Sequence, residues 1–210
     1  MLNVQYFSFW VTTSNILDNL LTTGAGLVIL GGAAPYVIQM ITSYFVGGHK
    51  DFHKSSCVFF AGLGLTISLT HFVKLYVGYL RPIFYDICEP DEAYEECTTG
   101  EDREARLSFP SGHASFSFCG LVLLSLYLER SFGITKLRVW KYDESTGQIF
   151  LSHTSYPGLR RIISIVCYAP VLLAGFIAAS RVADNKHFPA DVVGGSVLGS
   201  AVAMLVHGIW

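Results

Sequence analysis

Five long apolar stretches constrain this chain more than any other feature of its sequence. A helix needs roughly 20 mostly apolar residues to cross a bilayer, and the stretches that reach this length are 23–46, 56–80, 112–128, 162–180 and 189–206. Only 14% of the 210 residues are charged, whereas about a quarter are charged in a typical soluble domain. The sequence therefore predicts an all-α bundle of transmembrane helices. It argues against a soluble domain, a disordered chain and a nucleic-acid-binding protein, which would need a basic surface.

Residues 1–22 are ambiguous. They mix apolar side chains such as Phe9 and Trp10 with Asn, Thr and Asp18, a pattern that fits an interfacial helix or a reduced additional span. No cationic segment precedes the apolar residues, so they make a poor signal peptide. We therefore expect an N-terminal segment over 1–22 and one transmembrane domain over 23–207, with five or six spans.

Charge is unequal on the two sides of the predicted membrane. Segment 81–111 carries nine acidic residues between Asp86 and Glu104, whereas segments 47–55 and 129–161 on the other side are rich in Lys and Arg. The positive-inside rule places the basic segments in the cytoplasm. Segment 81–111 then faces the lumen or the exterior, where an oxidising compartment would favour a disulfide between Cys88 and Cys97.

Two smaller features lie outside this pattern. Cys57, Cys119 and Cys167 fall inside predicted spans, where a cysteine is usually a small buried apolar side chain.

Segment 131–160 contains turn-forming residues over 143–147 between two short β-prone stretches. It is expected to form a hairpin, or to bind anionic lipid through its basic residues.

Polar residues at the ends of the spans form three groups, all on the acidic side. A charge within a span is costly, so such residues are functional by default. Lys74 and Arg81 are seven residues apart, and on one helix they would share a face. Gly112 and His113 follow Ser111 at a helix start, where free backbone N–H groups can bind an anion.

The third group consists of Arg181, His187 and Asp191. A histidine and an aspartate at i and i+4 can form a hydrogen bond, which would fix the imidazole tautomer and favour its positive form. Each group taken singly also fits ordinary interface anchoring or helix capping. Together they bring three cations, helix amides and two histidines to one membrane face, which predicts a phosphate-sized anion site with a nucleophile and an acid.

These residues resemble the signature motifs of the type 2 phosphatidic acid phosphatase superfamily. The motifs are Lys74-(six residues)-Arg81-Pro82, Pro110-Ser111-Gly112-His113 and Ser180-Arg181-(five residues)-His187-(three residues)-Asp191. Segments 86–91 and 107–118 are most similar to the eukaryotic lipid phosphate phosphatase branch. Two departures stand out: the first of the family's usual six spans is reduced or missing, and Phe188-Pro189 replaces the His-Trp of many relatives.

The resemblance implies an integral membrane phosphatase that is independent of Mg²⁺ and uses no metal or other cofactor. His187 would attack phosphorus to give a phosphohistidine, Asp191 would orient and charge it, and His113 would protonate the leaving alkoxide. The phosphoryl oxygens would be held by Lys74, Arg81, Ser111, Gly112 and Arg181. A site at headgroup depth implies lipid substrates in the bilayer, namely phosphatidic acid, lysophosphatidic acid, diacylglycerol pyrophosphate or sphingoid-base phosphates.

Other functions would use the same residues. An isoprenoid-diphosphate phosphatase or a lipid phosphotransferase differs only in its leaving group or acceptor. A vanadate-dependent haloperoxidase has a similar arrangement of motif residues, but proteins of that class are soluble. A catalytically silent membrane scaffold should have lost a nucleophile or a cation, and this chain keeps all of them. The preferred lipid, the organelle and the oligomeric state stay open at this point.

Overall fold

The computed structural model describes residues 24–89, 102–132, 138–143, 147–153 and 157–209. The expectations for residues 1–22 and for Cys97 lie outside these ranges. Five helices in the described part are long and apolar enough to cross a membrane: Gly24–Phe45, Asp51–Val77, Gly112–Ser131, Ile162–Ala183 and Pro189–Ile209. The predicted all-α bundle is therefore confirmed, and the chain is an integral, multi-pass membrane protein.

The first span is a composite helix. It consists of α2 (Gly24–Leu27), the π-helical η1 (Val28–Ala33), α3 (Ala34–Thr42) and the π-helical η2 (Ser43–Gly47). Helix α4 (Gly48–Val77) follows directly. Segment 47–55, predicted to be a loop between two spans, does connect them, but it is helical from Gly48 on. That segment is polar but contains no proline, so the helix can continue beyond the apolar stretch.

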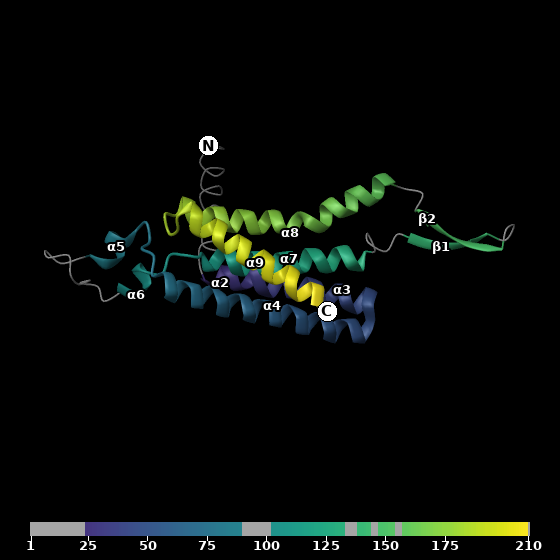
Figure 1. Cartoon of the computed structure of the whole chain (residues 1–210), viewed down its shortest axis with the longest axis horizontal. Coiled ribbons are helices and arrows are strands. Elements are labelled where there is room, and N and C mark those ends of the chain that lie inside the picture. Colours follow the sequence, from purple (N-terminus) through teal and green to yellow (C-terminus); the bar gives the residue numbers. More distant parts are fainter. Residues whose placement is uncertain (1–23, 90–101, 133–137, 144–146, 154–156, 210) are drawn as a thin grey trace, which may run out of the picture.

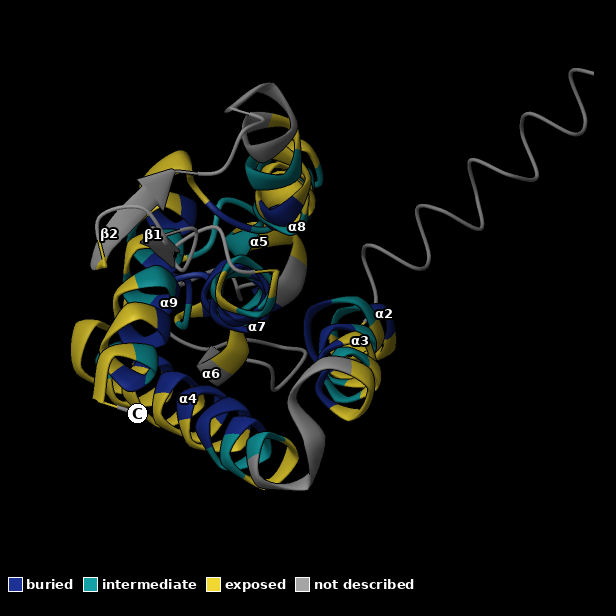
Figure 2. Ribbon diagram, turned by 90° about the vertical axis from the view of Figure 1, so that its right-hand side faces the viewer, coloured by how far each residue is buried: buried dark blue, intermediate teal, exposed yellow. Residues whose placement is uncertain are grey.

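Helix α7 (Gly112–Ser131) lies at the centre of the bundle. Figure 2 shows it surrounded by α4, α8 (Pro157–Ala183), α9 (Pro189–Ile209) and the first span. About 56% of its span is buried inside the protein, whereas the other four spans are 22–33% buried. The outer helices leave large apolar side chains exposed, including Phe60, Leu172 and Val197. That is the arrangement expected of helices whose outer faces contact lipid tails.

Glycines allow α9 to pack directly on α7. A Cβ atom at Gly195 would collide with the carbonyl oxygen of Ser111, and one at Gly199 with the carbonyl oxygen of Ser115. The small residues of α9 therefore permit a close approach of the two backbones, as their spacing in the sequence indicates. This contact fixes the start of α9 against the start of α7.

The two ends of the bundle differ (Figure 1). One end carries the short helices α5 (Phe84–Cys88) and α6 (Asp102–Ala105), and the other carries a hairpin of β1 (Arg138–Asp143) and β2 (Gln148–His153). The strands pair antiparallel with Arg138 opposite His153, which confirms the predicted hairpin. Cys88 is disulfide-bonded, and the three cysteines inside the spans are free.

Candidate active site

The three predicted groups meet at the end of the bundle opposite to the hairpin. They line a cavity of about 200 Å³ formed by His71, Lys74, Arg81, Glu104, Leu107, Gly112, His113, Arg181, Lys186 and His187. These residues come from α4, α7, α8 and the loops beside them. The helix ends thus bring together side chains that lie more than 100 residues apart in the sequence.

Lys74 and Arg81 reach the cavity by a route different from the predicted one. Helix α4 ends at Val77, and Gly78 has a positive φ of 58°. The Gly78 amide donates to the Lys74 carbonyl at 3.0 Å, which is a left-handed glycine cap. Gly78 therefore ends the helix before Pro82, and the expected shared helical face for the two cations is wrong.

Backbone hydrogen bonds place Arg81 instead. The Arg81 amide donates to the Ala105 carbonyl at 2.9 Å, and the Ser108 amide donates to the Tyr79 carbonyl at 2.9 Å. The segment after α4 is thereby fixed to the segment before α7. Arg81 and Lys74 both line the cavity because of this pairing.

The three cations have different surroundings. The Lys74 ammonium is buried and donates to the carbonyl oxygen of Leu107. Arg81 donates from Nη2 to Glu104 at 3.1 Å, and its buried Nε has no hydrogen-bond partner among the described residues. Arg181 is fully buried and lies 2.9 Å from the carboxylate of Asp184. A bound anion would therefore meet positive charge from side chains of α4, the loop after it and α8.

A histidine, an aspartate and a serine form a buried cluster beside this charge. Nδ1 of His187 lies 3.6 Å from Oδ2 of Asp191 and 3.4 Å from the Ser108 hydroxyl. The same Oδ2 accepts hydrogen bonds from Ser108 Oγ at 2.5 Å and from the Phe188 amide at 2.9 Å. The carboxylate is therefore fixed at Nδ1, an arrangement that leaves Nε2 as the nitrogen free to react.

The protonation state of His187 follows from its burial. Burial and then the positive charges of Lys74 and Arg81 lower the pKa of His187 to about 4, and Asp191 opposes them. The expectation that Asp191 makes this imidazole positive is therefore outweighed by desolvation. At neutral pH the ring is uncharged, and only an uncharged imidazole can act as a nucleophile.

The start of α7 supplies the second histidine. Ser111 is the N-cap, and its hydroxyl accepts from the Ala114 amide at 3.5 Å. Ser111 is not among the residues that line the cavity, but Gly112 and His113 are. Nε2 of His113 is buried and has no partner within the described residues. The helix start therefore presents an imidazole and first-turn amides to the cavity.

Sequence reasoning missed several residues of this site. Ser108, Glu104, Lys186 and His71 contact the predicted residues or line the cavity. Ser108 lies in a loop, and Glu104 lies in the single-turn helix α6, which is too short to show a helical period, so no spacing could assign them. Lys186 precedes His187 directly, and that adjacency was the one available signal.

A wider aromatic pocket adjoins the cavity. It measures about 480 Å³ and is lined by Gly78, Tyr79, Leu80, Arg81, Pro82, Phe84, Tyr85 and Phe188. The rings of Tyr79 and Phe188 lie 5.7 Å apart, nearly edge to face. Arg81 lines both spaces, so the two pockets meet at this side chain.

Fold and site together define a polytopic membrane protein with a histidine- and cation-lined anion cavity at one end of its helices. Comparison with known proteins gives the family. The sequence model of the PAP2 superfamily matches residues 55–210, and the chain therefore belongs to this superfamily. The resemblance seen in the three sequence motifs is thus confirmed.

Individual relatives are moderately similar. The chain is 29% identical over 186 residues to a PA-phosphatase related-family protein of Dictyostelium discoideum, covering 86% of this chain and 58% of that protein. It is 31% identical over 185 residues to phospholipid phosphatase 1 of Rattus norvegicus, covering 81% and 58%. The chain thus spans little more than half the length of these two relatives.

A solved structure has the same fold. The crystal structure of a transmembrane PAP2-type phosphatidylglycerolphosphate phosphatase from Bacillus subtilis superposes with a TM-score of 0.54 at 21% identity. The match covers 92% of this chain and 76% of the bacterial one. The helical arrangement described above is therefore shared with a membrane protein of this superfamily.

Proposed function

We propose that this protein is a lipid phosphate phosphatase that cleaves phosphate monoesters of membrane lipids through a phosphohistidine intermediate, without a metal ion. The observation that carries the proposal is the cluster of His187, Asp191 and Ser108, whose histidine lines a cavity together with four cationic side chains. A neutral, oriented imidazole beside a phosphate-sized positive site can carry out phosphoryl transfer.

In the first step Nε2 of His187 attacks phosphorus. An N–P bond forms and the bond from phosphorus to the lipid oxygen breaks, while protonated His113 gives its proton to the leaving alkoxide. The substrate dianion favours that protonated form of His113 by adding negative charge to the cavity. Diacylglycerol, or the corresponding alcohol, leaves.

In the second step water completes the hydrolysis. Neutral His113 takes a proton from water as the oxygen attacks phosphorus, the N–P bond breaks, and inorganic phosphate leaves His187 uncharged. Lys74, Arg81 and Arg181 balance the charge of the phosphoryl oxygens throughout. Because these side chains supply the positive charge, we expect full activity in EDTA.

The position of the site supports a lipid substrate. The catalytic side chains lie at the ends of the spanning helices, which is the depth of lipid headgroups. The adjoining aromatic pocket offers Tyr79, Phe84 and Phe188 to the first carbons of a lipid. The charge distribution of the loops favours the lumenal or extracellular side for this end.

The test is phosphate release from a short-chain phosphatidic acid by the detergent-purified protein in EDTA. We expect release by the native protein and a loss of at least about 1,000-fold for His187→Ala, because the nucleophile is removed. His53→Ala is the matched control, since His53 lies on α4 but lines neither the cavity nor the aromatic pocket. Substantial release by His187→Ala, or loss of activity in EDTA, would contradict the proposal.

Product analysis separates the related reactions. Free phosphate from a monoester supports the phosphatase, a new phospholipid identifies a phosphotransferase, and activity confined to isoprenoid diphosphates identifies a diphosphatase. The absence of every product with an intact fold identifies the silent scaffold.

A further inference from the structure

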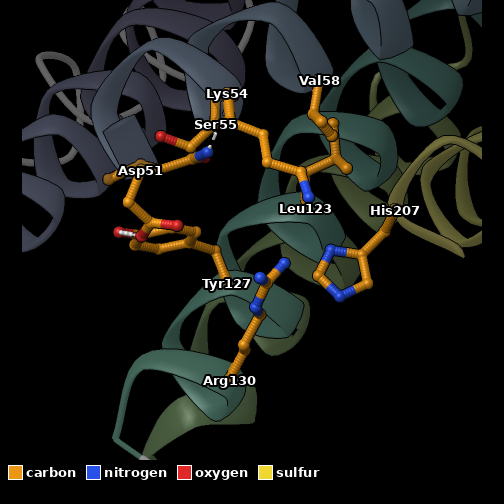
Figure 3. Close-up of a pocket in the computed structure, with 9 residues that line it drawn as sticks. Asp51, Lys54, Ser55, Val58, Leu123, Tyr127, Arg130 and His207 are labelled. Carbon is orange, nitrogen blue, oxygen red and sulfur yellow. Dashed lines mark hydrogen bonds between the residues drawn. The ribbon is translucent and has the colours of Figure 1, made fainter. Parts of the chain in front are cut away.

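A second cavity lies at the opposite end of the bundle from His187, and Figure 3 shows the side chains that line it. Its walls come from the first span, the start of α4, the end of α7 and the last turn of α9. The lining residues are Gln39, Asp51, Lys54, Ser55, Val58, Leu123, Tyr127, Arg130 and His207. Its enclosed volume of about 20 Å³ admits one water-sized group. A larger ligand would insert one group and lie across the mouth.

The cavity carries more positive than negative charge. Asp51 is the carboxylate in its lining, and the Tyr127 hydroxyl donates to it at 3.0 Å. Glu129, beside Arg130, instead accepts from the Tyr168 hydroxyl at 2.6 Å. Within the described part of the chain, the side chains of Lys54 and Arg130 form no ion pair or hydrogen bond. Of the described residues, two cations therefore face this cavity beside a single carboxylate that pairs with neither of them.

The inner wall offers an acceptor that is also unpaired. Gln39 is 2% exposed, and its Nε2 donates to the Ser55 carbonyl at 3.1 Å. Its Oε1 is buried and has no partner among the residues described. An amide oxygen accepts from a hydroxyl or a water, so a ligand for this cavity combines negative charge at the mouth with a donor at the inner wall.

Helix dipoles account for only part of this arrangement. Arg130 lies in the last turn of α7, where the helix dipole favours a cation in any case. Lys54 lies beyond the first turn of α4 and far from its last turn, so no helix dipole favours its charge. Helix capping therefore accounts for Arg130 but not for Lys54, which lines the same cavity.

We propose that this cavity binds the headgroup of an anionic phospholipid in the leaflet opposite to the catalytic cavity. Lys54 and Arg130 contact the phosphate, and a headgroup donor or its bound water reaches Gln39. The site lies at the helix ends, at headgroup depth, and basic pockets between spanning helices are known to bind anionic lipids. The nearby Phe52 is 41% exposed and offers an apolar surface to the acyl chains.

Native mass spectrometry of the full chain in detergent tests the proposal, with phosphatidylserine compared with phosphatidylcholine. Both are phosphodiesters, so neither is a substrate of a monoesterase. We expect phosphatidylserine to bind more tightly, and the double variant Lys54→Gln/Arg130→Gln to weaken it about 30-fold without changing phosphatidylcholine binding. The charge-conserving Lys54→Arg/Arg130→Lys should keep the preference, which separates charge from damage to the fold.

Further measurements show at which cavity the lipid binds and whether the site recognises a lipid or a free anion. Lys74→Gln, at the catalytic cavity, should leave phosphatidylserine binding unchanged, so the outcome does not depend on the proposed phosphatase activity. Equal binding of the two lipids overturns the proposal, and so does an unchanged preference in the double variant. Displacement of the lipid by millimolar inorganic phosphate also overturns it, since that identifies a site for a free anion.

Discussion

The hydroxyl of Ser108 donates a hydrogen bond of 2.5 Å to Oδ2 of Asp191, 83 residues further along the chain, and both side chains are buried. This contact ties the loop before α7 to the first turn of α9. It also fixes the carboxylate oxygen that lies beside Nδ1 of His187. In the proposed reaction Ser108 would therefore be a positioning residue, which acts through Asp191.

Replacement of this serine tests that role. We expect Ser108→Ala to lower kcat about tenfold with little change in KM, because a buried carboxylate loses a donor while the phosphate-binding cations stay in place. Steady-state kinetics on short-chain phosphatidic acid measures both constants. Ser117→Ala is the matched control, since Ser117 is equally buried but bonds only to carbonyls of its own helix. Equal losses in the two variants would refute the positioning role.

The aromatic pocket leads to a prediction on specificity. We expect Phe188→Ala to raise KM for a lipid phosphate about tenfold, because apolar contact with the first lipid carbons is lost. KM for glycerol phosphate, which has no acyl chain, should be unchanged. The comparison of the two substrates is the measurement, and a parallel rise for both would show that Phe188 acts on the phosphate site instead.

The protonation of His187 can be followed directly. Because burial lowers its pKa to about 4, folding favours the neutral ring, and protons bind the unfolded chain more readily between pH 6.5 and pH 4. The free energy of unfolding therefore decreases as the pH falls through this window, because His187 favours the unfolded chain when protons are available. NMR of histidine-labelled protein without substrate, assigned with His187→Gln, should show a ring that is uncharged at pH 5. A midpoint near 6.5 would contradict the burial argument.

Helix packing gives a prediction on stability. A Cβ atom at Gly199 would collide with the carbonyl oxygen of Ser115, so Gly199→Ala must push α9 away from α7. We expect a loss of about 1–3 kcal/mol, measured as thermal unfolding in detergent, together with reduced activity because the start of α9 carries Asp191. Gly175→Ala on α8 is the control, since nothing lies within 4 Å of its added Cβ. Equal stability of the two variants would exclude the predicted collision.

The sequence by itself determined the spans, their number in the described part and the three groups that form the site. The length of each apolar stretch can be read from local composition. A bilayer requires each crossing segment to form the hydrogen bonds of its own backbone, so such a stretch must be a helix. The positions of Lys74, His113, Arg181 and His187 at span ends could thus be predicted one helix at a time. The hairpin over 138–153 was equally local, since turn residues separate its two strands.

Only the tertiary structure decided how the site is assembled. Lys74 and Arg81 converge because Gly78 ends α4 and backbone pairs hold the following loop, and not because they share a helix face. Ser108 forms a hydrogen bond with Asp191, and Lys54 and Arg130 line one cavity. Each pair comes from segments far apart in the sequence, so no repeating pattern of residues could predict the contact. The physical reason is that a helix end is set by one residue's backbone, whereas a buried polar cluster depends on how distant helices pack.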